Sequence, residues 1–158
     1  MVGQLAFQGI PRTIEGTAVV DEHLWPPDEI GPVQDPIILQ ISKGQLVSIG
    51  GSSTKAAIYA RWLAGKEKGV KHFCIGYHPG ARLGRNICES ERAFGNISIG
   101  IGTYPFHTDG IMRRPTLKAD SAVVFKNGTF VPDELRALQE ELFRPYLDKE
   151  TIKSDSRS

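Results

Sequence analysis

Three residues of this sequence have the side chains and the spacing to hold a metal ion: His72, His107 and Asp109. In the run His107-Thr108-Asp109, the imidazole and the carboxylate are two residues apart, so both project from one face if the segment is extended. His72 lies in Val70-Lys71-His72-Phe73-Cys74-Ile75, a run typical of a separate strand. Two imidazoles and one carboxylate from neighbouring strands form the facial triad that binds mononuclear non-haem iron. We therefore interpret the three residues as ligands of Fe(II).

Each of these residues also has a simpler structural interpretation. A carboxylate such as Asp109 often bonds a turn amide at the end of a strand, and a lone histidine is more often a core residue than a ligand. Cys74 shares a strand face with His72, which opens the alternative of a zinc site made of His72, Cys74, His107 and Asp109. A thiol on a core strand is more usually a packing residue. Either metal needs neutral imidazole and ionised carboxylate, so the donor set alone does not choose between them.

Charged residues near these positions are the next candidates for a role in substrate binding or acid–base chemistry. Arg113 and Arg114 follow the histidine–aspartate pair closely and could bind the carboxylate of a substrate, although arginines on a surface are commonly solvated. We predict these two as substrate-binding residues. Glu89 and Glu91 would not share a helix face, so we predict no paired acid–base role for them.

Length and composition limit the possible function classes. With 158 residues the chain can bury one core, and we predict a single metal-site domain over 1–148 and a polar, frayed tail over 149–158. The net charge of +1 predicts neither a nucleic-acid partner nor attraction to an anionic membrane. The apolar runs are too short to span a bilayer, and the first residues do not form an export signal. Two cysteines are too few for a secreted disulfide scaffold, so we expect a cytoplasmic protein.

The order of helices and strands predicts an α+β fold, with a curved, mostly antiparallel sheet packed by two main helices. The first helix is capped by one of residues 52–54, runs to about Ala64 and is closed by Gly65. The second begins near Pro132 and should end before Pro145. Its apolar positions at helical spacing are Leu135, Leu138 and Leu142. A shorter helix is expected over 87–94.

Strands are expected where β-branched and aromatic residues gather between turn residues. The expected ranges are 4–7, 13–21, 36–41, 45–49, 69–76 and 96–102. Asn127-Gly128, between the β-rich runs 122–125 and 129–131, predicts a hairpin. The segment from Trp25 to Pro32 is rich in proline and is predicted to be irregular.

A longer pattern surrounds the candidate ligands. It consists of Gly76-Tyr77-His78-Pro79-Gly80-Ala81-Arg82-Leu83-Gly84-Arg85-Asn86-Ile87, then Glu89 and Glu91, Phe94-Gly95, and finally His107-Thr108-Asp109-Gly110. These residues resemble the C-terminal half of the aminopeptidase T/S-like metalloproteins. There the order is a G-x-N-P-x-A-R-like stretch, an acidic helix, a glycine-rich strand and an H-x-D-G-like metal motif. The similarity covers most of residues 2–131.

This superfamily contains two chemistries, and departures from the peptidase pattern distinguish them. The peptidases hold two metal ions in a glutamate-rich site. Here Gln4 stands at the first glutamate position, His72 at the second, and Ser98 near a strand histidine. The remaining two histidines and one carboxylate are similar to the 2,5-dihydroxypyridine 5,6-dioxygenase branch. The resemblance thus implies Fe(II) held by His72, His107 and Asp109, with positions left open for substrate and O2.

The resemblance also implies the partners. The substrate would be a small hydroxylated aromatic or heteroaromatic molecule such as a dihydroxypyridine, with O2 as co-substrate. Tyr104 is predicted to position one of them as a catalytic residue, and we expect a homo-oligomer. Members of both branches are longer and carry an N-terminal α/β domain before the similar part. An aminopeptidase-like metallohydrolase and a non-catalytic, truncated, oligomerising relative are therefore the two alternatives.

Overall fold

The computed structural model describes residues 3–84 and 86–155, with side chains up to Arg144. The expected α+β class with mostly antiparallel sheets is confirmed. The strands and helices form two compact units, residues 1–115 and residues 116–158. The single domain over 1–148 stays a prediction beside this division. Arg85 of the sequence pattern and residues 156–158 of the expected tail lie outside the described residues.

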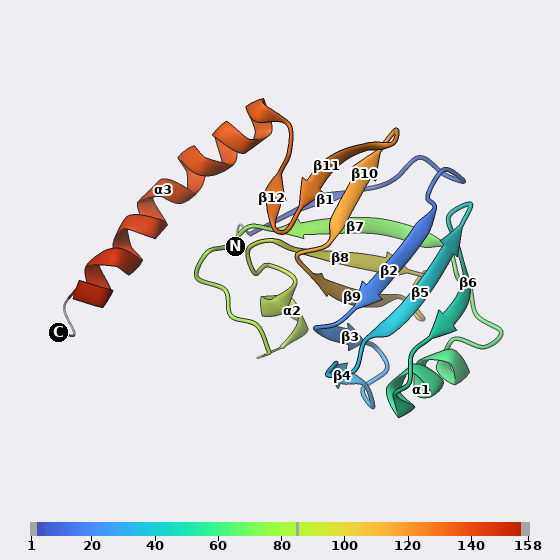
Figure 1. Ribbon diagram of the computed structural model, residues 1–158. Coiled ribbons are helices and arrows are strands. Elements are labelled where there is room, and N and C mark those ends of the chain that lie inside the picture. Colours follow the sequence, from blue (N-terminus) through green and yellow to red (C-terminus); the bar gives the residue numbers. More distant parts are fainter. Residues whose placement is uncertain (1–2, 85, 156–158) are drawn as a thin grey trace. The chain divides into compact units, whose positions relative to one another are not determined.

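The larger unit is built on a six-stranded, antiparallel sheet (Figure 1). In spatial order its strands are β1 (Gln4–Phe7), β7 (Val70–Gly76), β8 (Asn96–Ile101), β9 (Thr108–Arg113), β3 (His23–Trp25) and β4 (Gly31–Pro32). A second antiparallel sheet holds β2 (Gly16–Val20), β5 (Ile37–Ser42) and β6 (Gln45–Gly50). A Cβ on Gly110 of β9 would lie 2.7 Å from the side chain of Val20 on β2, so the two sheets pack closely here.

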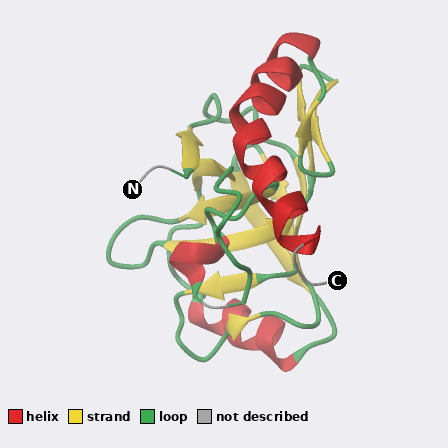
Figure 2. Ribbon diagram, turned by 90° about the vertical axis from the view of Figure 1, so that its left-hand side faces the viewer, coloured by secondary structure: helices red, strands yellow, loops and turns green. Residues whose placement is uncertain are grey.

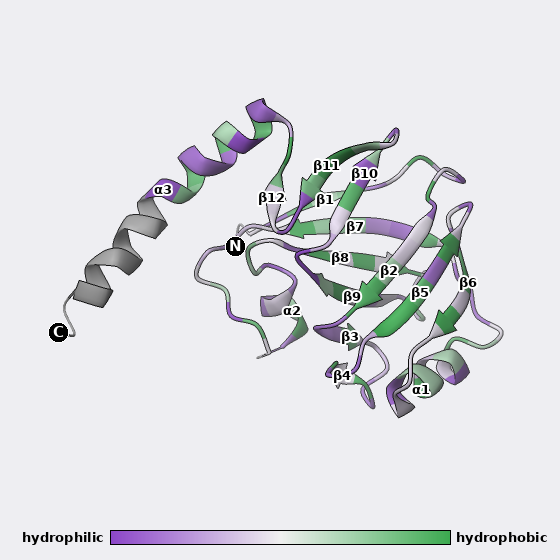
Figure 3. Cartoon of the chain, viewed as in Figure 1, coloured by the Kyte–Doolittle hydropathy of each residue, from purple (hydrophilic) through white to green (hydrophobic). Residues whose placement is uncertain are grey.

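The two faces of the six-stranded sheet differ in character, because side chains alternate along each strand. The face toward the second sheet is apolar, and Figure 3 shows β8 coloured mostly hydrophobic. Its buried side chains include Leu24, Phe73, Ile75, Ile97, Ile99 and Met112. The opposite face is more polar and carries His72, Cys74, Asn96, Ser98 and Asp109. The candidate metal ligands therefore lie on the face that does not form the main core.

Two helices complete the larger unit. The helix α1 (Thr54–Trp62) is capped by Ser53, whose hydroxyl accepts the Ala56 N–H, and it contacts β5 and β6. The helix α2 (Ile87–Ser90) is shorter than the expected 87–94. The helix ends before Glu91, and the residues after it pack along the end of β7. There the carbonyls of residues 91 and 93 lie close to Gly76. The Asn96 amide donates to the Ser90 carbonyl, so α2 covers part of the polar face.

The proline-rich segment corrects one expectation. Trp25 closes β3, and Gly31–Pro32 forms β4, so regular structure occupies both ends of a stretch predicted to be irregular. A proline is tolerated in β4 because this strand lies at the edge of the sheet, where one side needs no N–H donor.

The smaller unit is a three-stranded sheet with one long helix. The strands are β10 (Thr116–Ala119), β11 (Ala122–Lys126) and β12 (Thr129–Phe130), followed by α3 (Asp133–Asp155). The predicted hairpin is confirmed: Asn127 and Gly128 adopt φ angles of 53° and 88° between β11 and β12. None of the helices that the structure describes is long and apolar enough to cross a membrane.

The long helix α3 departs from the sequence prediction in two ways. It continues through Pro145 to Asp155 as one helix (Figure 2), so the expected end before Pro145 is wrong. A proline inside a helix removes one N–H donor, and good helix formers on both sides outweigh that loss. The leucine stripe is exposed, with exposed fractions of 43%, 52% and 59% for Leu135, Leu138 and Leu142. Gln139 and Phe143 form the buried side instead.

Gln139 fastens this helix to the hairpin. Its carbonyl oxygen accepts the Phe130 N–H at 2.9 Å, and its amide donates to the Gly128 carbonyl at 3.0 Å. We expect Gln139→Ala to lower the free energy of unfolding by about 1–2 kcal/mol, since two backbone groups lose their partner. Urea denaturation followed by circular dichroism measures the change. Glu140→Ala, on the exposed side, is the control, and an equal effect of the two variants would contradict the predicted role of Gln139.

Candidate metal centre

The register of three neighbouring strands brings the candidate ligands together. His72 on β7 pairs with Gly100 on β8, and Gly100 pairs with Asp109 on β9. Residues that lie directly opposite each other project from the same face, so His72 and Asp109 flank Gly100 on the polar face. His107 directly precedes β9, two residues before Asp109, and its ring joins the same group.

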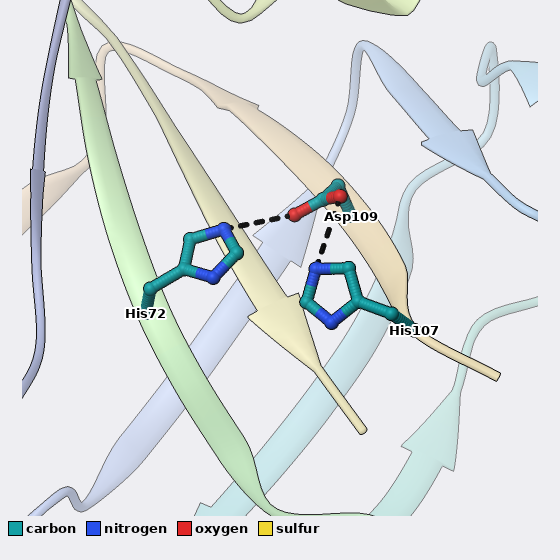
Figure 4. A group of neighbouring side chains, drawn as sticks. All are labelled: His72, His107 and Asp109. Carbon is teal, nitrogen blue, oxygen red and sulfur yellow. Dashed lines mark ion pairs between the residues drawn. The ribbon is translucent and has the colours of Figure 1, made fainter. Parts of the chain in front are cut away.

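The three side chains point toward one another (Figure 4). His72 Nε2 lies 3.1 Å from Asp109 Oδ1, and His107 Nε2 lies 3.3 Å from Asp109 Oδ2. The two imidazole rings stack with their centroids 5.1 Å apart. One donor atom from each residue lies within 4.8 Å of the other two, a separation that one bound cation can bridge. We call His72, His107 and Asp109 the ligand trio.

Gly100 makes this arrangement possible. A Cβ on Gly100 would lie 2.6 Å from both ring nitrogens of His72 and closer still to Cε1. The His72 ring therefore lies in the space that any other residue at position 100 would fill. The absence of a side chain on β8 lets ligands from β7 and β9 meet above the strand between them.

The orientation of His107 is fixed by the backbone. Its Nδ1 lies 2.8 Å from the Gly102 carbonyl oxygen, which can only accept a hydrogen bond. Nδ1 therefore carries the proton, and in the neutral ring Nε2 keeps a free lone pair directed toward Asp109. The Gly102 N–H donates in turn to the Gly69 carbonyl at 2.9 Å, so this support is tied to the start of β7.

The electrostatics of the trio favour positive charge. The Asp109 carboxylate is the largest cause, and the Cys74 thiol the second, of a rise in the pKa of His72 to about 10, which burial opposes. Asp109 Oδ1 is buried and accepts no well-directed hydrogen bond from any described residue, although His72 Nε2 is near. A cation would satisfy this oxygen. The residues present thus fit a divalent metal by donor type and by this buried oxygen, and a bound metal would take the place of the proton that the raised pKa keeps on His72 near neutral pH.

The other predicted site residues lie outside the trio. Cys74 is buried beside His72 on the polar face, but its sulfur is not among the mutually close donor atoms. Tyr104, in the loop before His107, is 93% exposed. The Arg113 guanidinium is engaged by Asp21 and Glu22, with Nε 3.5 Å and 3.8 Å from their carboxylates. Arg114 is exposed. The roles of Tyr104, Arg113 and Arg114 stay predictions.

Two residues beside the trio were missed by the sequence reasoning. Residues 96–102 were expected to be a glycine-containing strand, but only the strand register shows that Gly100 lies beneath the His72 ring. Trp25 was placed in an irregular segment, whereas it pairs with Asp109 across β3 and β9. The signal for Trp25 was its aromatic side chain next to β-favouring residues, and the prolines that follow obscured it.

Comparison with known proteins gives one structural relationship. The structure of a 2,5-dihydroxypyridine dioxygenase from Pseudomonas putida KT2440 is similar to this chain, with a TM-score of 0.66 and 21% sequence identity. The match covers 83% of this chain and 44% of that one, so this chain spans less than half of the matched protein's length. No family model matches the sequence, and no curated protein does. The similarity supports a dioxygenase-like fold, and the aminopeptidase T/S-like relationship stays a prediction.

Proposed function

We propose that this chain holds one Fe(II) ion at the ligand trio and acts as a ring-cleaving dioxygenase on a small hydroxylated aromatic molecule such as a dihydroxypyridine. The observation that carries the proposal is the meeting of two imidazoles and one carboxylate on one sheet face. This donor set is typical of non-haem iron oxygenases. The similarity of the fold to a 2,5-dihydroxypyridine dioxygenase supports the same chemistry.

Each residue of the ligand trio, and the backbone beside it, would have its own role in holding the metal. His72 and His107 would offer their Nε2 atoms, and Asp109 would add the negative charge that offsets part of the metal's charge. The Gly102 carbonyl would hold the His107 ring in place through Nδ1. A bound ferrous ion would supply the one-electron chemistry that lets O2 react with an electron-rich ring. The partly exposed trio would leave that ion accessible to small molecules.

A dinuclear, aminopeptidase-like site is the second candidate, and the side chains nearby favour it less. In the described residues, the ligand trio is the set of three or more potential donors that lie close enough to share an ion. Gln4 and Ser98 offer an amide and a hydroxyl, which are weaker metal ligands than the carboxylate and imidazole they would replace. The non-catalytic relative is the third candidate. A homo-oligomer and a cytoplasmic location stay predictions.

Iron binding tests the proposal directly. Protein purified without oxygen and given Fe(II) should bind one ion per chain, consume O2 and remove 2,5-dihydroxypyridine. We expect His72→Ala, His107→Ala and Asp109→Ala each to weaken Fe(II) binding by about 100-fold or more, because each removes one of three ligands. Binding is measured by competition with a coloured chelator, and O2 uptake with an electrode.

His78→Ala is the matched control. His78 sits in a turn, where its Nδ1 accepts the Gly80 N–H at 3.1 Å, and its loss should leave iron binding unchanged. Two zinc ions per chain together with peptide hydrolysis would favour the aminopeptidase-like alternative. A folded protein that binds neither metal would favour the non-catalytic alternative.

A further inference from the structure

Trp25 stands beside the ligand trio on the same face of the sheet. In the register of β3 and β9 it lies directly opposite Asp109, and in an antiparallel sheet such residues project from one face, with Cβ atoms about 4.5–5.5 Å apart. His72, Gly100, Asp109 and Trp25 thus form one row across four strands. The row begins with a candidate ligand and ends with an indole.

The indole is both accessible and held in place. Its exposed fraction is 45%, although most tryptophans bury more of their surface. The Nε1–H donates to the Asp28 carboxylate at 2.5 Å. The next residue, Pro26, accepts the Thr108 hydroxyl at 2.6 Å, which ties this turn to the start of β9. The hydrogen-bonding edge of the ring is therefore occupied, and what remains for a ligand is its π-face.

We propose that Trp25 is the stacking surface for a planar aromatic ligand that is bound to the metal at the ligand trio. The inference rests on the proposed function, because the metal fixes one edge of the ligand beside Asp109. A flat ring held at that edge lies within reach of the neighbouring indole, and offset-stacked rings attract each other at centroid distances of about 4.5–7 Å. A ligand with the same metal-binding oxygens but no ring gains nothing from Trp25. Trp25 is thus a specificity-determining residue that selects aromatic ligands.

A pair of chelators separates stacking from metal binding. The probes are 4-nitrocatechol, which is aromatic, and oxalate, which also offers two oxygens to the metal but has no ring. Both are titrated anaerobically into the Fe(II)-loaded protein. Binding of 4-nitrocatechol is followed by its absorbance, and binding of oxalate by the displacement of bound 4-nitrocatechol. We expect Trp25→Leu to weaken 4-nitrocatechol binding by about tenfold and oxalate binding by less than about twofold. Trp25→Phe keeps a ring and should recover most of the difference.

Two further variants complete the test. Asp28→Ala frees the indole N–H while keeping the ring. It should weaken the binding of 4-nitrocatechol by about threefold and leave the binding of oxalate unchanged. This variant also tests the stacking role if Trp25→Leu fails to fold. Val47→Ala removes an exposed apolar side chain from β6 and should change neither affinity.

The outcomes distinguish the stacking role of Trp25 from metal binding at the ligand trio. If Trp25→Leu still binds Fe(II) and binds both probes as tightly as the wild type does, the stacking role alone is overturned. Equal weakening of both probes overturns it too, because Trp25 would then act through the trio. A wild-type protein that binds no metal overturns the proposed function and this inference with it.

Discussion

Replacing Gly100 with alanine is expected to remove most of the metal affinity and to leave the protein folded. The new Cβ would lie 2.6 Å from both ring nitrogens of His72, so the ring must turn away from Asp109. The site would then keep two of its three ligands. We expect Fe(II) binding to weaken by about 100-fold or more, as measured by competition with a chelator of known affinity.

Gly50→Ala is the matched control for this substitution. Gly50 also lies in a strand, but a Cβ there would approach no atom closer than 3.8 Å, which is ordinary contact. Gly100→Ala should lower the free energy of unfolding by about 1–3 kcal/mol through overpacking, and much of that cost should vanish in a His72→Ala background. Unchanged iron affinity in Gly100→Ala would show that the His72 ring over Gly100 is not a ligand.

The reason for the large effect lies in the geometry of a sheet. Ligands on β7 and β9 are separated by two strand spacings, about 9–10 Å. An imidazole and a carboxylate can close that distance only if they lean toward each other over the middle strand. Any side chain at position 100 would occupy the space between them. A glycine at the centre of the site is therefore as necessary to the proposed metal centre as the ligands beside it.

The local part of this site could be predicted from the sequence. The spacing of His107 and Asp109 predicts one shared face in an extended segment, and the structure places both side chains together. The Asn127-Gly128 hairpin and a helix cap within residues 52–54 were equally local, and both are confirmed, with Ser53 as the cap. In each case the governing contact joins residues that are close in the chain, so composition and spacing were enough.

The long-range part could not be predicted in the same way. The meeting of His72 with Asp109 depends on the register of β7, β8 and β9, and β7 carries an irregularity between Val70 and His72. A slip of one residue would send His72 to the other face, and no local pattern excludes such a slip. His72 was interpreted as the third ligand from its strand-like run, and the resemblance to a metalloprotein family implied the same residue, but the register itself is visible only in the structure.

The helix α3 shows the same limit in its packing. Its leucines have the right spacing for a buried stripe, yet Gln139 and Phe143 are the buried side chains. Helical periodicity predicts that a stripe exists but does not identify what covers it. The hydrogen bonds of Gln139 to Gly128 and Phe130 fix which side faces the hairpin. A polar residue thus orients a helix whose apolar pattern suggested another face.

Removing the Glu22 carboxylate should destabilise the protein by about 2–4 kcal/mol, since this buried group serves three donors. Oε1 accepts the Gly84 N–H at 2.8 Å and the Ser90 hydroxyl at 3.1 Å, and Oε2 lies 3.8 Å from Arg113 Nε. In Glu22→Ala all three donors would lose this partner, and one of them, the Ser90 hydroxyl, is fully buried. Urea denaturation measures the loss, and Glu22→Gln, which keeps an acceptor oxygen, should show a smaller one.

Glu15→Ala is the control, because Glu15 also accepts a backbone N–H, from Lys43 at 2.8 Å, but is exposed. Its loss should cost less than about 1 kcal/mol, since water can replace an exposed acceptor. Hydrogen exchange locates the effect of Glu22→Ala: the amide of Gly84 should exchange faster. Similar stability losses in the two variants would contradict a buried anchor at Glu22.

The Glu22 carboxylate also links α2, which covers part of the polar face, to the sheet that carries the ligand trio. Ser90 ends α2, and its carbonyl accepts the Asn96 amide, while Arg113 ends β9 and holds Asp21 as well. Glu22 joins these elements without being one of the three ligands. Iron affinity of the folded Glu22→Ala protein should therefore stay within about threefold of wild type, in contrast to Gly100→Ala. A loss of iron binding as large as that of Gly100→Ala would show that the position of α2, and not the strand register alone, sets the geometry of the ligand trio.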